Sequence, residues 1–273
     1  MKAYMQTGWD WLKEHIYIWV ILFLYQLLWG FFVYRFIDGI VVPVLRRYPD
    51  PAPTEMSSQL FLIESQFHLS KTNDYAPYLW ILVGCVAIRM LLTPLIEAGL
   101  FYAIAQPRQS GLAFFRGIKA MWKPMLLLYA LKMVLLLAPA YWFVPYAAHV
   151  LTASSTAVSA LASVAPFVLI WAVCGWIFHH LFLFMQFGAA SELSLLRSVT
   201  AGVRKLLPIL GISLIFMGLV LAVSILFTTA AMFWTGMTAL ILQQAFPAIR
   251  VLCKMWGLSA RYAIWQEANQ QPK

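Results

Sequence analysis

The sequence is poor in charged residues, and this scarcity excludes an ordinary soluble domain. Only 11% of the 273 residues are charged, whereas 63% are hydrophobic. Soluble domains contain about 25% charged and about 45–50% apolar residues. Uncharged runs extend over Ile16–Tyr34, Met133–Ser191 and Leu206–Ile249. A membrane-spanning helix needs about 20 apolar residues, so each of the two longer runs can hold two spans.

Cysteines are also few, and their placement argues against a disulfide framework. Cys85, Cys174 and Cys253 all lie in apolar segments rather than in loops, so we interpret them as small packing residues. The chain lacks a Walker phosphate loop, and no set of Ser, His and Asp can be nominated for catalysis. The sequence therefore predicts no catalytic residue, no metal site and no cofactor.

The long apolar runs predict an all-α fold, a polytopic bundle of six transmembrane helices in one domain over residues 1–273. Continuous apolarity favours helices, because strands of a membrane barrel would alternate and extend over only about 10 residues. Asp10 and Glu14 precede the first run, unlike the basic start of a cleaved signal peptide, so we expect this span to remain. The predicted spans are Ile16–Ile37, Tyr78–Ile104, Pro124–Val150, Ala160–Gly188, Pro208–Thr229 and Met237–Leu258.

Orientation follows from the Lys and Arg content of the short connections. Residues 106–123 hold four basic residues and no acid, and residues 189–207 hold three basic residues against Glu192, whereas 151–159 and 230–236 are uncharged. The basic connections are therefore predicted inside, with both termini cytoplasmic. Anionic lipids attract such residues, and the predicted contacts are Arg116, Lys119, Lys123, Arg197, Arg204 and Lys205.

The connection 38–77 is then predicted outside, and acids outnumber basic residues in it. Met56, Leu60, Ile63 and Phe67 recur at helical spacing, so an amphipathic helix is expected there. This helix could be a lid or partner surface, or an ordinary interfacial helix.

Both basic connections share one construction, which indicates a parallel internal repeat. Each begins with a Ser that can cap a helix, continues with an apolar face and a basic face, and reaches a Pro that can open the next span. The serines are Ser110 and Ser191, the prolines are Pro124 and Pro208, and the expected apolar faces are Leu112, Phe115, Ile118 and Trp122 in the first copy and Leu196, Val199, Val203 and Leu206 in the second.

At the segments Ser110–Pro124 and Ser191–Pro208 the chain resembles a loose group of bacterial six-span membrane proteins of unknown function. These proteins are akin to the membrane domain fused to some glycerophosphodiester phosphodiesterases. The resemblance covers about Tyr78–Thr229. It implies a bacterial plasma membrane and carries over no phosphodiesterase activity, because no catalytic domain is present.

Ionisable residues within predicted spans are the candidate functional residues, because they are costly inside a bilayer. At 1.5 Å per residue, Glu97, Lys132, the His pair and Arg250 all lie roughly 10–13 Å from the inner ends of four spans. Arg89 lies nearer the bilayer centre, on the helical face that also holds Thr93 and Glu97. The candidates for a substrate or proton path are Arg89, Glu97, Lys132, His179, His180 and Arg250.

Two arrangements of this polar layer are open. It could line a hydrated cavity, or it could be sealed by a Glu97–Lys132 ion pair with Arg250 extending toward the inner surface. The first favours a non-enzymatic protein that transports or accommodates a small or lipid-like substrate. The second favours an accessory subunit that recruits partner proteins or further copies of itself through its basic helices. A lipid-modifying enzyme is the third hypothesis, and no nucleic-acid partner is expected.

Overall fold

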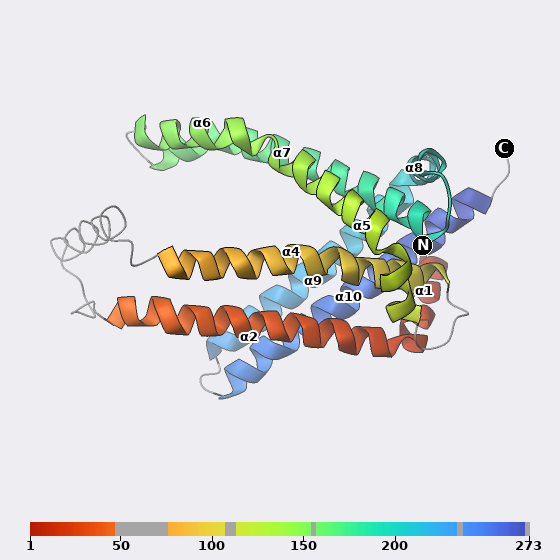
Figure 1. Cartoon of the computed structure of the whole chain (residues 1–273), viewed down its shortest axis with the longest axis horizontal. Helices are drawn as coiled ribbons and strands as arrows, with labels where there is room; N and C mark the ends of the chain where they lie inside the picture. The colour runs from red at the N-terminus through yellow and green to blue at the C-terminus, as the bar shows by residue number, and fades with distance from the viewer. Residues whose placement is uncertain (47–75, 107–112, 154–156, 234–236, 271–273) are drawn as a thin grey trace.

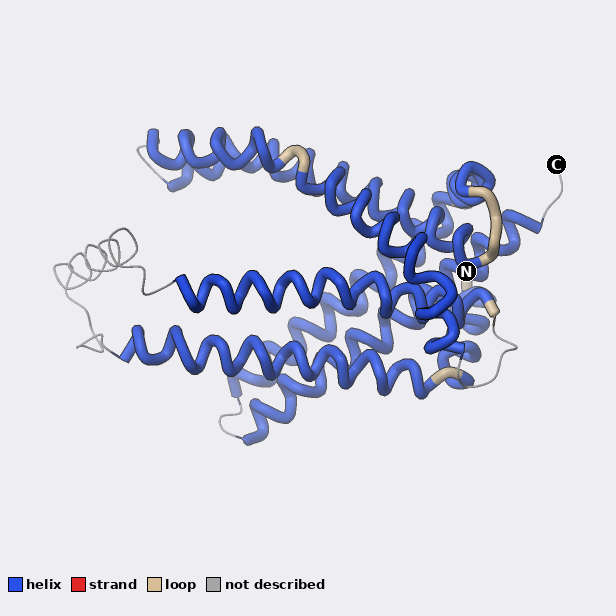
Figure 2. The backbone as a smooth tube through the Cα atoms, viewed as in Figure 1, coloured by secondary structure: helices blue, strands red, loops and turns tan. Residues whose placement is uncertain are grey.

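The computed structural model describes residues 1–46, 76–106, 113–153, 157–233 and 237–270, and within these ranges every regular element is an α-helix (Figures 1 and 2). The all-α prediction is therefore confirmed for the described part of the chain. The predicted outer amphipathic helix and Ser110 lie outside the described residues. The helices are α1 (Lys2–Glu14), α2 (Ile16–Arg46), α4 (Ala76–Ala105), α5 (Ala113–Leu137), α6 (Ala140–Ala153), α7 (Ala157–Ala190), α8 (Leu195–Arg204), α9 (Leu206–Phe233) and α10 (Met237–Gln270).

Five segments of these helices are long and apolar enough to cross a membrane: Ile16–Gly39, Trp80–Ala105, Ala113–Val150, Leu161–Ala190 and Leu206–Ala230. Four of them begin and end within two residues of predicted spans. The predicted sixth span, Met237–Leu258, is not among the five. It lies in α10 and contains Arg250 and Lys254, and Arg261 and Glu267 follow it.

The third predicted span, Pro124–Val150, is wrong at its start, whereas its end agrees with the candidate span Ala113–Val150. The helix begins eleven residues earlier, at Ala113, and Pro124 lies inside α5 rather than at its first position. A helix that already has its first turns can continue past a proline by giving up one hydrogen bond. The span is then interrupted by a turn at Ala138–Pro139 before α6.

The helices converge at one end of the molecule, called here the packed end, and spread at the other, called the open end (Figure 1). α5, α6 and α7 form one arm, and α2 and α4 form another, with α9 and α10 behind them. The largest fully buried side chains include Phe114, Met125, Phe184, Phe187 and Trp265, all near the packed end. Large apolar side chains toward the open end, such as Ile81 and Leu161, are exposed.

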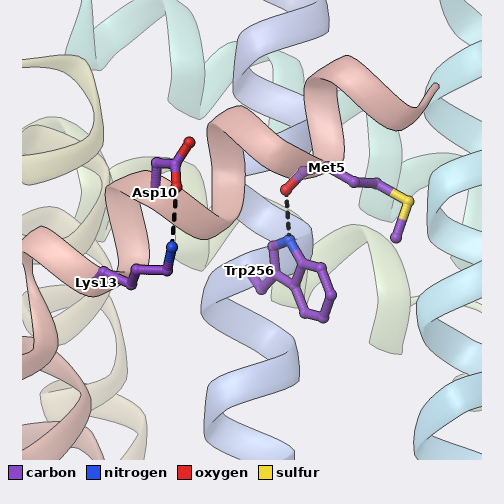
Figure 3. Close-up of polar contacts among 4 residues, drawn as sticks. All are labelled: Met5, Asp10, Lys13 and Trp256. Atoms are coloured by element: carbon purple, nitrogen blue, oxygen red, sulfur yellow. Dashed lines mark hydrogen bonds and ion pairs between the residues drawn. The ribbon is translucent and has the colours of Figure 1, made fainter.

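The N-terminal helix α1 lies across α10 at the packed end, a contact that the sequence analysis did not foresee. Gly8 allows the two helices to approach, because a Cβ atom there would lie 2.9 Å from the backbone nitrogen of Ala260. Trp256 donates from Nε1 to the carbonyl of Met5 over 2.8 Å, whereas Lys13 pairs with Asp10 at the exposed surface (Figure 3). The Tyr4 hydroxyl donates to the Glu267 carboxylate, and this bond raises the pKa of Tyr4.

Candidate functional site

The two basic segments are the start of α5 and helix α8. Each packs against the span that precedes it, and small residues lie at the contact. In the first copy, Gly117 faces Tyr102 of α4, and a Cβ atom at Gly117 would lie 2.5 Å from the Cβ of Tyr102. In the second copy, Gly202 of α8 lies against the ring of Phe184, and Gly188 lies against Ser198. The repeat seen in the sequence thus has a counterpart in packing, because a glycine at the same place in each copy permits the close approach.

The connection between α7 and α8 differs from the expected one. Ser191 does not cap α8; its hydroxyl contacts that of Tyr262 over 3.1 Å, and Ser194 is the N-cap residue. Glu192 adopts a left-handed conformation, and the Leu193 N–H donates to the carbonyl of Gly188. This pattern closes the end of α7, because it satisfies carbonyls that a helix terminus leaves free. Burial raises the pKa of Tyr262, although the contact with Ser191 opposes the shift.

The apolar faces predicted for the two basic segments are not the buried ones. Gly117 and Met121 face the protein in the first copy, and Ser198, Ala201 and Gly202 do so in the second. The predicted apolar residues Phe115 and Leu196 are 54% and 84% exposed. The buried side consists of small residues in the second copy, whereas in the first copy it also contains Phe114 and Met121.

The six predicted lipid-contact residues lie at the packed end. Lys123 lies over the ring of Trp122, with 5.6 Å between its Nζ and the ring centroid. Lys205 is half-buried and pairs with Glu267, with 3.7 Å between Nζ and Oε1. The residues Arg116, Lys119, Lys123, Arg197 and Arg204 are exposed.

Helix α7 connects the residues of the predicted polar layer, because side chains of α4, α5 and α9 form hydrogen bonds with it. Gln186 donates from Nε2 to Oε2 of Glu97 on α4 over 3.2 Å. Lys132 of α5 lies 3.1 Å from Nδ1 of His179. Glu97 and Lys132 therefore contact different residues of α7. Among the described residues, the direct Glu97–Lys132 ion pair considered above is not formed.

The contact between Lys132 and His179 defines how the imidazole is protonated. An ammonium group can only donate, so Nδ1 of His179 must accept, and the neutral ring then carries its proton on Nε2. His179 is exposed and Lys132 is partly exposed. The pair therefore lies at a surface of the protein rather than in sealed packing.

His180 has a different environment from its neighbour. Only 3% of its surface is exposed, and the two imidazole rings are nearly perpendicular. Its Nδ1 donates to the Trp176 carbonyl over 2.9 Å, and its Nε2 lies 3.2 Å from the Ser213 hydroxyl, which also contacts the Ile209 carbonyl. If the His180 ring is neutral, Nε2 and the Ile209 carbonyl must both accept the single hydroxyl hydrogen of Ser213. If the ring is protonated, Nε2 donates to the Ser213 hydroxyl, which itself donates to Ile209, and the contacts with Trp176, Ser213 and Ile209 are all satisfied.

The two arginines of the candidate set lie apart from these contacts. Arg89 is exposed, and its guanidinium carbon lies 5.8 Å from the centroid of the Trp29 ring of α2. Its backbone carbonyl accepts a hydrogen bond from Thr93 over 2.7 Å. Arg250 is exposed on α10. The structure therefore brings together Glu97, Lys132, His179 and His180 around α7, and it does not bring Arg89 or Arg250 into their hydrogen bonds.

Two further polar residues form hydrogen bonds with the layer and were not predicted from the sequence, namely Gln186 and Ser213. Gln186 follows His179 by seven residues, which places both on one face of α7, so its position is a usable signal. Ser213 is a single hydroxyl in an apolar run and gives no such signal.

A cavity of about 620 Å³ lies beside this pair, toward the open end. It is open to the outside of the protein, and its walls come from the last turn of α5, the turn Ala138–Pro139, α6 and α7. These walls are almost entirely apolar. It extends close to the polar pair, because Leu135 lies one turn after Lys132 and Phe178 directly precedes His179. The other lining residues include Trp142, Tyr146, Phe167, Trp171 and Cys174.

The described residues contain no group of three His, Cys, Asp or Glu side chains that could hold a metal ion.

Long apolar helices with exposed apolar surfaces define a helical protein embedded in a membrane. No protein-family model, curated protein or solved structure matches the chain. Its function is therefore inferred from the residues themselves.

Proposed function

We propose that this protein is a non-enzymatic membrane protein that accommodates or transports a small or lipid-like substrate through the polar layer around α7. The observation that carries the proposal is the Lys132–His179 pair, which joins α5 to α7 and lies at the surface of the protein. Charged groups at such depth are costly unless a partner, water or a ligand solvates them. A pair that is open on one side is suited to receive a polar group.

The same proposal includes six passages through a plasma membrane, with the packed end on the cytoplasmic side. Both basic segments, α1 and the end of α10 lie at this end (Figure 1). An excess of Lys and Arg favours the cytoplasmic side. The exposed apolar sides of the basic segments would enter the lipid interface, and their basic sides would contact anionic headgroups.

Single-cysteine labelling tests whether the layer is hydrated. Cysteine is introduced at Glu97, Lys132 or His179 in a chain without its three native cysteines, and a small water-soluble thiol reagent is added from each side. We expect reaction from one side, because the open surface admits water. Leu131→Cys is the matched control: Leu131 is exposed beside Lys132, but it should face lipid and remain unreactive.

Absence of labelling at all three positions in a folded protein would contradict this function. It would favour the second candidate, an accessory subunit that recruits partners. The exposed apolar and basic sides of α8 are the observation that supports this alternative.

A further inference from the structure

We propose that the ligand of this site is a single-chain amphiphile with an anionic head, whose chain fills the apolar cavity and whose head contacts Lys132 and His179. This inference rests on the proposed function and specifies its substrate class. A fatty carboxylate and a long-chain alkyl phosphate share the required chemistry.

The apolar part of the ligand is inferred from the size and walls of the cavity. Its volume of about 620 Å³ is within the roughly 300–1,000 Å³ of small-molecule sites. Along α7 the lining extends from Phe167 to Phe178, which is about 16 Å at 1.5 Å per residue. Trp142, Phe143, Tyr146 and Trp171 contribute aromatic walls. An elongated, flexible hydrocarbon chain fits this shape better than a polar solute.

The anionic head is inferred from the charges near the cavity's polar end. The Lys132 ammonium has the neutral imidazole of His179 as its hydrogen-bond partner. The Glu97 carboxylate accepts from Gln186 of α7 and does not pair with this ammonium, so the positive charge of Lys132 has no anionic partner among its hydrogen bonds. A ligand anion would balance the excess charge, which an uncharged lipid could not do.

The polar part of the proposed site, Lys132 and His179, lies close to the apolar cavity along both α5 and α7. Leu135 lies three residues after Lys132, and Phe178 adjoins His179. An anion held by the Lys132 ammonium and by Nε2–H of His179 would therefore have its chain at the entrance of the cavity. His179 can donate from Nε2 because Nδ1 accepts from Lys132.

Photolabelling in nanodiscs of uncharged phosphatidylcholine tests the proposal. The probes are a long-chain alkyl phosphate and a fatty carboxylate, each with a diazirine in the chain, and the matching fatty alcohol. We expect saturable labelling of peptides from 135–146 or 167–178 by one or both anions, and much weaker labelling by the alcohol. The anion that binds more tightly identifies the head group.

Five variants connect this labelling to the residues. Lys132→Gln should weaken anion binding roughly ten- to a hundredfold, because a charge-assisted contact is lost, whereas Lys132→Arg should largely retain it. Lys13→Gln is the matched control, because Lys13 is exposed on α1 and is not among the predicted lipid contacts; this variant should bind like the native protein. Cys174→Trp, or the smaller change Ala138→Leu, should reduce labelling by filling the cavity.

The proposal is overturned if the alcohol labels as strongly as the anions, or if Lys132→Gln binds like Lys13→Gln. The cavity would then be covered by bulk lipid chains. Failure of the proposed function is a separate result, since it is read from cysteine labelling of the polar layer. A hydrated layer without anion binding would preserve the function and exclude only this substrate class.

Discussion

At the residue scale, the glycines of the two basic segments determine how closely these segments approach the spans. A side chain at Gly117 would have to occupy the space of the Tyr102 Cβ, which cannot rotate away. By contrast, Gly218 of α9 has open space where its Cβ would lie. Identical substitutions at these two helical positions therefore have opposite expected effects.

Gly117→Ala should destabilise the protein by about 1–3 kcal/mol, because overpacking forces the helices apart. Gly218→Ala should be neutral or should stabilise by up to about 1 kcal/mol, because alanine favours a helix more than glycine does. The thermal midpoint of the purified protein, measured by fluorescence-detected size exclusion, compares the two variants. Equal midpoints would mean that the α4–α5 contact is not formed as described.

The polar residues show which parts of a site the sequence can reveal. Glu97, Lys132 and the His pair were found because charge is rare in apolar runs. Their partners could not be assigned, because pairing depends on how helices rotate about their axes. Gln186 takes the place expected for Lys132 beside Glu97, and Lys132 instead contacts His179.

At the scale of elements, helix type and most span boundaries follow from hydrophobicity, but the direction of an amphipathic face does not. The sequence identifies an apolar side of each basic segment but not the surface against which that side packs. In α8 the side of small residues packs against the protein, because Ser198 and Gly202 allow closer contact than leucine would. In a membrane the apolar side has another partner, which is lipid.

We therefore expect the apolar side of α8 to enter the bilayer. A fluorescent probe on Leu196→Cys should be quenched strongly by lipids brominated in their chains, whereas a probe on Arg197→Cys, the matched control, should be quenched weakly. Both side chains are exposed in the protein, so the difference reports on the membrane alone. Equal weak quenching would place α8 in water and favour a protein partner for its apolar side.

At the scale of the whole molecule, the core lies at one end and the two arms diverge at the other. Prolines and the break at Ala138–Pro139 indicate locally irregular helices but not the direction of the arms, so the divergence could not be predicted from the sequence. Local stability follows the density of buried apolar contacts. The packed end should therefore be rigid and the open end adaptable.

Spin-label distances measure this difference. A pair at Ile81 and Leu161, in opposite arms at the open end, should give a broad distribution that narrows when the cavity is occupied by an anionic amphiphile. A pair at Lys119 and Thr200, at the packed end, should give a narrow distribution that does not respond. A narrow and invariant distribution for the first pair would show that the arms are fixed.

The protonation of the Lys132–His179 pair has an electrical consequence. Because the imidazole accepts from the ammonium, the pair carries one positive charge rather than two. Moving one elementary charge across the full membrane potential changes the energy by about 2.3 kcal/mol per 100 mV. A movement of the empty pair through the field would therefore be voltage-dependent. The same movement with a bound monovalent anion would transfer no net charge and would be electrically silent.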